Sequence, residues 1–241
     1  MIALILQGRM DSTRLPGKCL LPLEGEPLIY RVMEALAAVP CDMRILACPE
    51  NCQTAFNKYA EKAGFIISTG SETDVLARYC DVIRRYSPEL VIRATADNPF
   101  VFADAAASLT REAVHKQADY AGYTGLPYGA GVEVINAQAL LKAERESAAL
   151  EEREHVCPYL YGHPELFRIY QPPAPGQWQG SNIRLTVDTR EDYRYAQKLY
   201  RLINEYTTGR ERYTGTTILE YAACIGNQAE QLKVCRQRAP V

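Results

Sequence analysis

Four short apolar runs, each followed by a segment of helical period, constrain the fold more than any other feature of this sequence. The runs are rich in aliphatic and β-branched residues, and the segments between them repeat apolar residues every three or four positions. This alternation is typical of a mainly parallel sheet covered by helices, because parallel strands need long crossover connections. We expect strands at residues 2–6, 44–48, 65–68 and 90–95, and helices at residues 28–38, 51–63 and 75–86.

The second half of the chain carries shorter signals. From Asp119 the sequence runs through DYAGY, a glycine-rich stretch and VEVI before helical patterns return, which indicates an insertion at about residues 119–170. We expect one domain over residues 1–241. Within the second half we expect helices at residues 137–146, 151–161 and 189–204, and a last strand at residues 183–187.

Composition excludes several classes of protein. The formal net charge of −2 offers no global field for nucleic acid or an anionic membrane. No apolar run approaches the roughly 18–20 residues that span a bilayer, and no basic segment leads into a long apolar one at the N-terminus. The eight cysteines are scattered without zinc spacing, so we expect reduced thiols and a soluble, cytoplasmic protein.

The loops after the strands carry the candidate chemistry, because ligands of open α/β sheets bind beyond the carboxyl ends of the strands. The first loop, QGRMDSTRLPGK, holds Arg9, Arg14 and Lys18 beside glycines, a set that suits a polyphosphate. Asp97 and Asp188 each follow an apolar run and would supply the one or two carboxylates that Mg²⁺ takes from a protein.

A structural alternative stays open for each of these residues. A loop with two arginines and a lysine is commonly only solvated, and an aspartate after a strand is often a helix cap. Other nucleotide or hydrolase motifs are absent, including Walker A, G-x-G-x-x-G, D-x-D, G-x-S-x-G and H-E-x-x-H. Because three separate segments place cations or carboxylates at the carboxyl edge of the predicted sheet, we favour the functional interpretation.

The first loop also resembles a known signature. QGRMDSTRLPGK is similar to the Q-A-R-M-x-S-T-R-L-P-G-K motif of the cytidylyltransferases of spore-coat polysaccharide biosynthesis, which are related to acylneuraminate and octulosonate cytidylyltransferases. GSETDVLARY, VIRATADNP, VEV, EREHVCPY and LTVDTREDY match in order, so the resemblance covers roughly residues 1–204. It implies a Rossmann-like α/β nucleotidyltransferase fold, CTP as donor, Mg²⁺ as cofactor and a homodimer.

The resemblance also implies roles for individual residues. The catalytic cations would be Arg9, Arg14 and Lys18, and the metal carboxylates Asp97 and Asp188. Substrate binding falls to Glu133, Arg153, His155 and Arg184, with residues 119–170 as an acceptor-binding or dimerisation lobe. The nucleotide-binding set would be Leu6, Gln7, Gly8, Arg9, Arg14, Lys18, Ser71, Asp74, Val75, Arg78 and Asp97.

Alternatives remain for several of these positions. Asp74 can serve only as a helix cap with Arg78 paired to it one turn later, and the E-R-E-H stretch can form a solvated or dimer-contact face. The chain also departs from the family near the acceptor: it has YGAGVE where members often have D-G-x-D-V-E, so Tyr128 and Gly131 replace aspartates.

The sequence therefore predicts a Mg²⁺-dependent cytidylyltransferase that activates a sugar acid or related acceptor for surface-glycan synthesis. The alternatives are a sugar-phosphate nucleotidyltransferase that uses another base and a nucleotide-binding module without catalysis. The sequence does not identify the acceptor.

Overall fold

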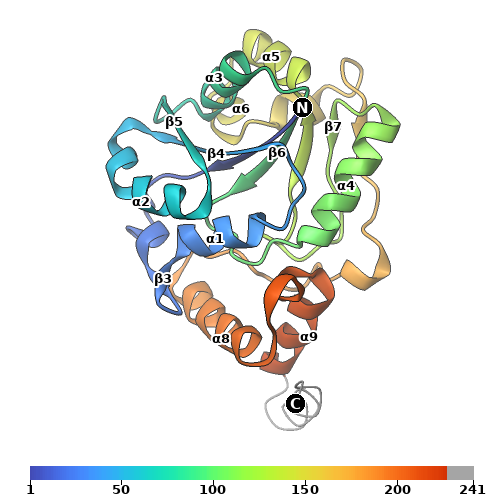
Figure 1. Cartoon of the computed structure of the whole chain (residues 1–241). Coiled ribbons are helices and arrows are strands. Elements are labelled where there is room, and N and C mark those ends of the chain that lie inside the picture. Colours follow the sequence, from blue (N-terminus) through green and yellow to red (C-terminus); the bar gives the residue numbers. More distant parts are fainter. Residues whose placement is uncertain (227–241) are drawn as a thin grey trace.

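In the computed structural model, which describes residues 1–226, the centre of the molecule is a seven-stranded sheet of order β5-β4-β1-β6-β8-β7-β9 (Figure 1). A separate two-stranded hairpin, β2 and β3, follows the first loop. The strands are β1 Ile2–Gln7, β2 Pro22–Leu23, β3 Glu26–Pro27, β4 Met43–Pro49, β5 Ile66–Gly70, β6 Leu90–Thr95, β7 Tyr120–Ala121, β8 Glu133–Asn136 and β9 Ile169–Tyr170.

Strand direction creates a crevice beside β1. β4 and β6 both run parallel to β1 and pair with its two sides, so the chain leaves β1 toward one edge and later returns to the other. Gln7 and Thr95 end these neighbouring strands and pair with each other. The loops after β1 and β6 therefore diverge from a topological switch point, which is where ligands bind in open α/β sheets. Only β8 runs antiparallel to the central strands.

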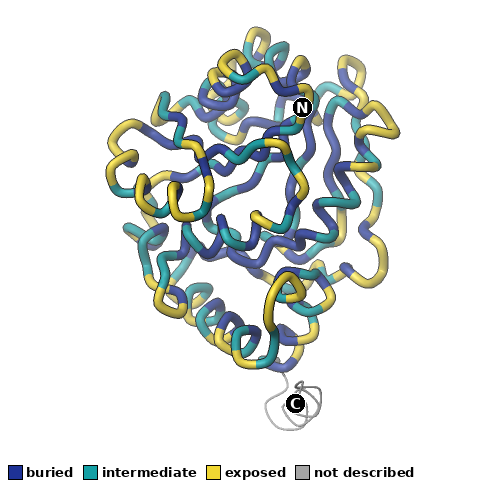
Figure 2. The backbone as a smooth tube through the Cα atoms, viewed as in Figure 1, coloured by how far each residue is buried: buried dark blue, intermediate teal, exposed yellow. Residues whose placement is uncertain are grey.

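Helices cover both faces of the sheet, as alternation within β1 requires. Leu4 and Leu6 pack in one buried cluster with helices α1, α2 and α4, whereas Ala3 and Ile5 pack in another with α3 and α5 (Figure 2). The helices are α1 Leu28–Leu36, α2 Gln53–Ala63, α3 Val75–Tyr86, α4 Ala103–Lys116, α5 Ala137–Glu146, α6 Leu150–His155 and α7 Pro158–Gly162, with 3₁₀ turns η1 Lys18–Leu20 and η2 Glu50–Cys52.

The C-terminal helices form a third cluster below the sheet (Figure 1). They are α8 Arg190–Tyr206 and α9 Gly215–Gly226, with the 3₁₀ turns η3 Gly176–Trp178 and η4 Gly209–Tyr213 beside them. Asp104 at the start of α4 accepts hydrogen bonds from Trp178 Nε1 (3.0 Å) and from the backbone N–H of Gly215 (2.9 Å). This carboxylate joins the C-terminal helices to the body of the molecule.

None of the helices within residues 1–226 combines the length and the apolar character that crossing a bilayer requires.

The structure confirms the predicted α/β class, and one predicted strand is wrong. Residues 183–187 are extended but lie outside the sheet, where Tyr128 and Arg184 form an isolated bridge. Their backbone groups bond to loops instead: Leu185 N–H donates to Tyr128 O (2.8 Å) and Val187 N–H donates to Asp97 O (2.8 Å). The segment expected to be an insertion supplies β7, β8 and β9 to the central sheet, and its role in acceptor binding or dimerisation stays a prediction.

Candidate active site

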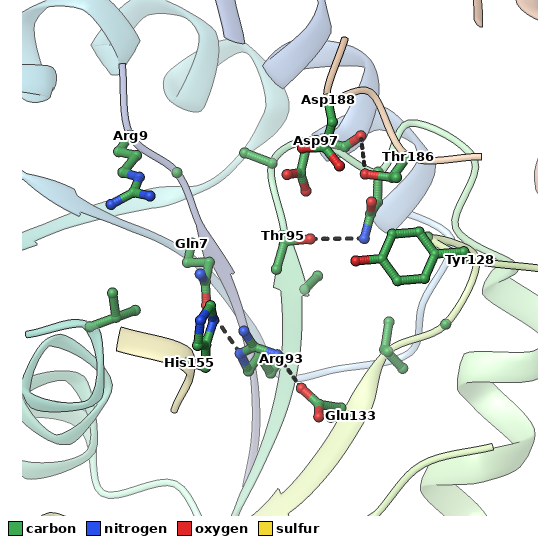
Figure 3. A pocket seen from close by; sticks show the side chains of 18 of the residues that line it. Gln7, Arg9, Arg93, Thr95, Asp97, Tyr128, Glu133, His155, Thr186 and Asp188 are labelled. Atoms are coloured by element: carbon green, nitrogen blue, oxygen red, sulfur yellow. Dashed lines mark hydrogen bonds and ion pairs between the residues drawn. The ribbon is translucent and has the colours of Figure 1, made fainter. Parts of the chain in front are cut away.

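A cavity of about 650 Å³ opens at the carboxyl edge of β1 and β6 (Figure 3). The loop after β1 forms one wall, and residues from Tyr120 to Glu133 form much of the opposite wall. The structure brings eleven of the predicted residues to its lining: Gln7, Gly8, Arg9, Arg14, Lys18, Val75, Arg78, Asp97, Glu133, His155 and Asp188.

Five predicted residues do not line this cavity. Leu6 is fully buried in the core, and Arg184 Nη2 donates a hydrogen bond to Asp188 Oδ2. Ser71 Oγ accepts the backbone N–H of Asp74 (3.0 Å), and Asp74 caps α3 by accepting the Ala77 N–H (2.9 Å). Arg153 Nε, not Arg78, pairs with Asp74 (2.7 Å). Ligand roles for these residues stay predictions.

Two glycines shape the loop after β1. A Cβ on Gly8 would meet Ala96 Cβ at 3.2 Å and Ile29 Cδ1 at 3.3 Å, so a larger residue would push the loop away from the sheet. Gly17 has φ +66°, a conformation that L side chains rarely adopt, and it begins the η1 turn. Because Lys18 is the first residue of that turn, this backbone directs its side chain toward β6.

Lys18 lies between the two predicted metal carboxylates. Its Nζ is 2.9 Å from Asp97 Oδ2, 3.0 Å from Asp188 Oδ1 and 2.9 Å from the carbonyl oxygen of Val187. Burial alone would lower the pKa of Lys18, but the charges and hydrogen bonds of the two aspartates raise it above its ordinary value. Three oxygens therefore surround a positive charge at the mouth of the cavity.

The two loop arginines lie further out. Arg14 Nη2 is 3.0 Å from Asp188 Oδ1, and Arg9 Nη2 is 3.3 Å from Glu154 Oε1. Both arginine side chains are exposed, so these pairs hold them weakly and leave them able to turn toward an incoming anion. The loop thus presents three cations along one side of the cavity.

The donor set around Lys18 fits a hard divalent cation. Asp97 and Asp188 offer carboxylate oxygens, and Mg²⁺ usually takes only one or two of these from a protein while phosphate and water complete its shell. Within residues 1–226 there is no group of three or more His, Cys, Asp or Glu side chains that could hold an ion without such help. A metal held by Asp97 and Asp188 would therefore take its other ligands from a bound phosphate and from water.

Arg78 is a buried cation with two guanidinium nitrogens left unpaired by the described residues. The residue is only 3% exposed and borders the cavity from α3, yet its Nε and Nη1 hydrogen-bond to no atom within residues 1–226. Burial lowers the pKa of this arginine because no carboxylate compensates for lost water. An unpaired guanidinium beside a cavity is expected to bind a ligand that offers acceptor atoms.

The cavity lining also holds a polar network in which Gln7 and Glu133 were predicted from the sequence and Arg93 and Tyr120 were not. Arg93 Nε donates to Gln7 Oε1 (3.0 Å), and Arg93 forms an ion pair with Glu133, which also accepts the Tyr120 hydroxyl (2.7 Å). Burial would lower the pKa of Arg93, but the Glu133 charge raises it, while burial and that charge raise the pKa of Tyr120. Other lining residues that were not predicted include Asn98, Gln171 and Thr186.

A mostly parallel sheet with a cation-rich loop after its first strand, and two carboxylates at the same edge, defines an α/β nucleotidyltransferase. The family model described as "Cytidylyltransferase" matches residues 3–235, and the chain belongs to that family.

A relative in sequence agrees with this assignment, and two solved structures agree with the fold. The chain is 35% identical over 211 residues to the "Spore coat polysaccharide biosynthesis protein SpsF" of Bacillus subtilis (strain 168), covering 85% of this chain and 88% of that protein. A cytidylyltransferase structure from Leptospira borgpetersenii serovar Hardjo-bovis superposes with a TM-score of 0.82 at 23% identity, over 100% of this chain and 98% of the other. A CMP:2-keto-3-deoxy-manno-octonic acid synthetase superposes with a TM-score of 0.65 at 16% identity, over 83% and 98%.

Proposed function

We propose that this enzyme transfers CMP from CTP to a sugar acid or related acceptor, with release of pyrophosphate and with Mg²⁺ as cofactor, in the synthesis of a surface glycan. The observation that carries the proposal is the cluster of Lys18, Asp97 and Asp188 at the mouth of a cavity whose loop also bears Arg9 and Arg14. Cations on one side and a carboxylate pair on the other suit a triphosphate with its metal.

The chemistry needs positioned charge more than it needs a reactive side chain. An acceptor oxygen attacks the α-phosphorus of CTP, a new P–O bond forms, the bond to the β-phosphate oxygen breaks and the acceptor proton passes to water. Arg9, Arg14 and Lys18 stabilise the charge that develops on the phosphate oxygens. Mg²⁺ held by Asp97 and Asp188 would neutralise phosphate charge and orient the leaving group.

The relatives support the finer parts of the proposal. The name of the Bacillus protein points to polysaccharide synthesis, and the octonic acid synthetase structure is a complex with CTP. A manganese complex of the Mycobacterium tuberculosis protein Rv0371C, with a TM-score of 0.57 and 16% identity, supports a divalent metal. We propose a cytoplasmic homodimer on the basis of the resemblance alone.

Arg78 supports cytosine as the base. Cytosine presents two neighbouring acceptors, O2 and N3, on its pairing edge, whereas uracil carries a hydrogen on N3 and would face the guanidinium with a donor. A bidentate arginine–base contact contributes about 1–3 kcal/mol of discrimination. In this proposal the buried unpaired guanidinium of Arg78 reads the base.

The test is calorimetric binding of CTP, UTP, GTP, ATP and dTTP in the presence of Mg²⁺. We expect wild type to bind CTP in preference to the others, Arg78→Lys to lose most of the CTP/UTP discrimination, and the double variant Lys18→Ala with Asp97→Ala to lose nucleotide binding. A matched control is Arg84→Lys, because Arg84 lies on the same helix but is exposed and does not line the cavity.

Other outcomes select the alternative functions. Tighter binding of another nucleotide by wild type would favour a sugar-phosphate nucleotidyltransferase of different base preference. CTP binding without pyrophosphate release in the presence of any sugar acid would favour a nucleotide-binding module, and no nucleotide binding would refute the anion-loop argument itself.

A further inference from the structure

Tyr128 is an exposed aromatic ring at the rim of the cavity. The residue is 62% exposed, compared with 45% for Tyr161, the other exposed tyrosine within residues 1–226. It also lines the cavity. Figure 3 shows its ring on the other side of Thr95 from Gln7 and Arg9. A single exposed aromatic ring is ordinary on a protein surface. The place of this ring in the lining of the candidate site is what makes it available to a ligand there.

The backbone fixes this ring in place. Tyr128 N–H donates to Ile183 O (2.9 Å), and Leu185 N–H donates to Tyr128 O (2.8 Å). The following residue, Gly129, has φ +92°, and a Cβ there would meet the backbone nitrogen of Thr186 at 2.7 Å. The ring therefore projects from a rigid, tightly packed turn.

One face of the ring is occupied by a cation. The guanidinium carbon of Arg184 lies 4.8 Å from the ring centroid, which is a cation–π contact. Arg184 is itself held by Asp188 (Nη2 to Oδ2, 2.5 Å) and by Asp192 (Nε to Oδ1, 3.1 Å). Because Arg184 covers one face, the other face is the one left for a ligand.

The cavity that Tyr128 lines also presents neutral hydrogen-bonding groups. Asn98 Nδ2 donates to Thr95 Oγ1 (2.8 Å), and Thr186 and Gln171 also line the cavity. Amides and hydroxyls pair well with sugar hydroxyl groups, and the electron-rich face of a tyrosine packs against the C–H groups of a sugar ring.

We propose that Tyr128 forms the acceptor platform: the free face of its ring packs against the C–H face of a pyranose, while Asn98, Gln171 and Thr186 bind the hydroxyl groups of that sugar. The proposal rests on the proposed function, because it concerns the second substrate of the same site. It assigns acceptor selection to ring stacking at a residue outside the phosphate loop.

The test uses Tyr128→Phe, which keeps the ring, and Tyr128→Leu, which keeps apolar bulk without an aromatic face. Pyrophosphate release is measured with CTP, Mg²⁺ and a panel of pyranoses and pyranose acids, and KM and kcat are determined for the sugar that wild type uses best. We expect Tyr128→Leu to raise the acceptor KM about tenfold with kcat within about twofold of wild type, and Tyr128→Phe to behave like wild type. The KM for CTP stays unchanged in both variants.

Several results would overturn the platform. They are an unchanged acceptor KM in Tyr128→Leu, a Phe variant as weak as the Leu variant, or a raised KM for CTP, which would place the nucleoside on the ring. Failure of every pyranose with a wild-type protein that binds CTP and releases pyrophosphate with another acceptor would also overturn it. If wild type does not bind CTP, or releases pyrophosphate with no acceptor, the proposed function itself fails, so the two failures are distinguishable.

Discussion

At the scale of single residues, the position of Lys18 couples the metal carboxylates to the phosphate loop. Its ammonium lies about 3 Å from oxygens of both Asp97 and Asp188, at the place that a divalent cation would take between them. Two cations cannot share this space, because they repel each other strongly at short distance. Two unit charges about 4 Å apart repel by about 4 kcal/mol at an effective dielectric constant of 20. Nucleotide phosphates give Lys18 another partner, so metal and nucleotide should bind together.

Replacing Lys18 by methionine should therefore raise the affinity of the nucleotide-free protein for Mn²⁺ by about tenfold, because the competing charge is removed. Binding of CTP should weaken at the same time, since the phosphates lose a cation. Titration with Mn²⁺ followed by electron paramagnetic resonance measures the first effect. Lys62→Met is the matched control, because it removes the same charge at an exposed site on α2. Equal Mn²⁺ affinity in wild type and Lys18→Met would contradict the argument.

At the scale of elements, a half-buried carboxylate connects α1 to α8 and, through Tyr200, to η4. Glu34 accepts hydrogen bonds from Arg31 Nη1 (2.8 Å) and from the Tyr200 hydroxyl (2.9 Å), and Tyr200 is also bonded to the Tyr213 hydroxyl (3.1 Å). Burial opposes ionisation of Glu34, but Arg31 and Tyr200 outweigh it and hold its pKa below the ordinary value. The ionised carboxylate thus joins helices from opposite ends of the sequence.

This cluster predicts a pH dependence. A carboxyl group whose pKa is lower in the folded state stabilises the protein above its unfolded pKa, and that contribution is lost as the pH falls through the folded pKa. Glu34→Gln should lower the free energy of unfolding at pH 7 by about 1.5–3 kcal/mol and by less at acid pH. Urea unfolding at pH 7 and pH 4 measures the difference, with the exposed Glu205→Gln on α8 as control. A penalty that is equal at both pH values would exclude the ionic contribution.

The elements also show how far sequence reasoning extends. Strands β1, β4, β5 and β6 were predictable because they are apolar runs between helical segments, and α3 was predicted with the same bounds that the structure has. The short hairpin of β2 and β3 was not predicted. Helix α4 was missed because its N-cap, Phe102, offers no side-chain hydrogen bond as a start signal. Residues 183–187 have the composition of a strand, but their partners are loops, and no local pattern encodes that contact.

The candidate site likewise contains residues that the sequence predicts and contacts that it does not. Arg9, Arg14, Lys18, Asp97 and Asp188 were found because they follow apolar runs, and Arg78 could be noticed as a charge on the apolar face of α3. The stacking of Arg184 on Tyr128 was not predictable, because the two residues are distant in sequence and meet only in the folded chain.

At the scale of the whole molecule, the site depends on all three parts of the fold: the first loop, the end of β6 and the segment before α8. A ligand that joins them should stabilise the folded chain as a unit. At a concentration 100 times its Kd, CTP with Mg²⁺ should add about 2.7 kcal/mol to the free energy of unfolding. Thermal unfolding measures the shift in Tm, and the double variant Lys18→Ala with Asp97→Ala should show none. A shift retained by that variant would place the nucleotide elsewhere.

The distance along the chain between Lys18 and its partners has a consequence for synthesis. Asp97 follows Lys18 by 79 residues and Asp188 follows it by 170, so the ribosome makes the cations well before their carboxylates. At about 5–20 residues per second, roughly ten to thirty seconds separate the first part of the site from the last. A nascent chain therefore carries the basic loop without its Asp188 partner until residue 188 has left the ribosome, and a chain released before that point lacks the second metal carboxylate.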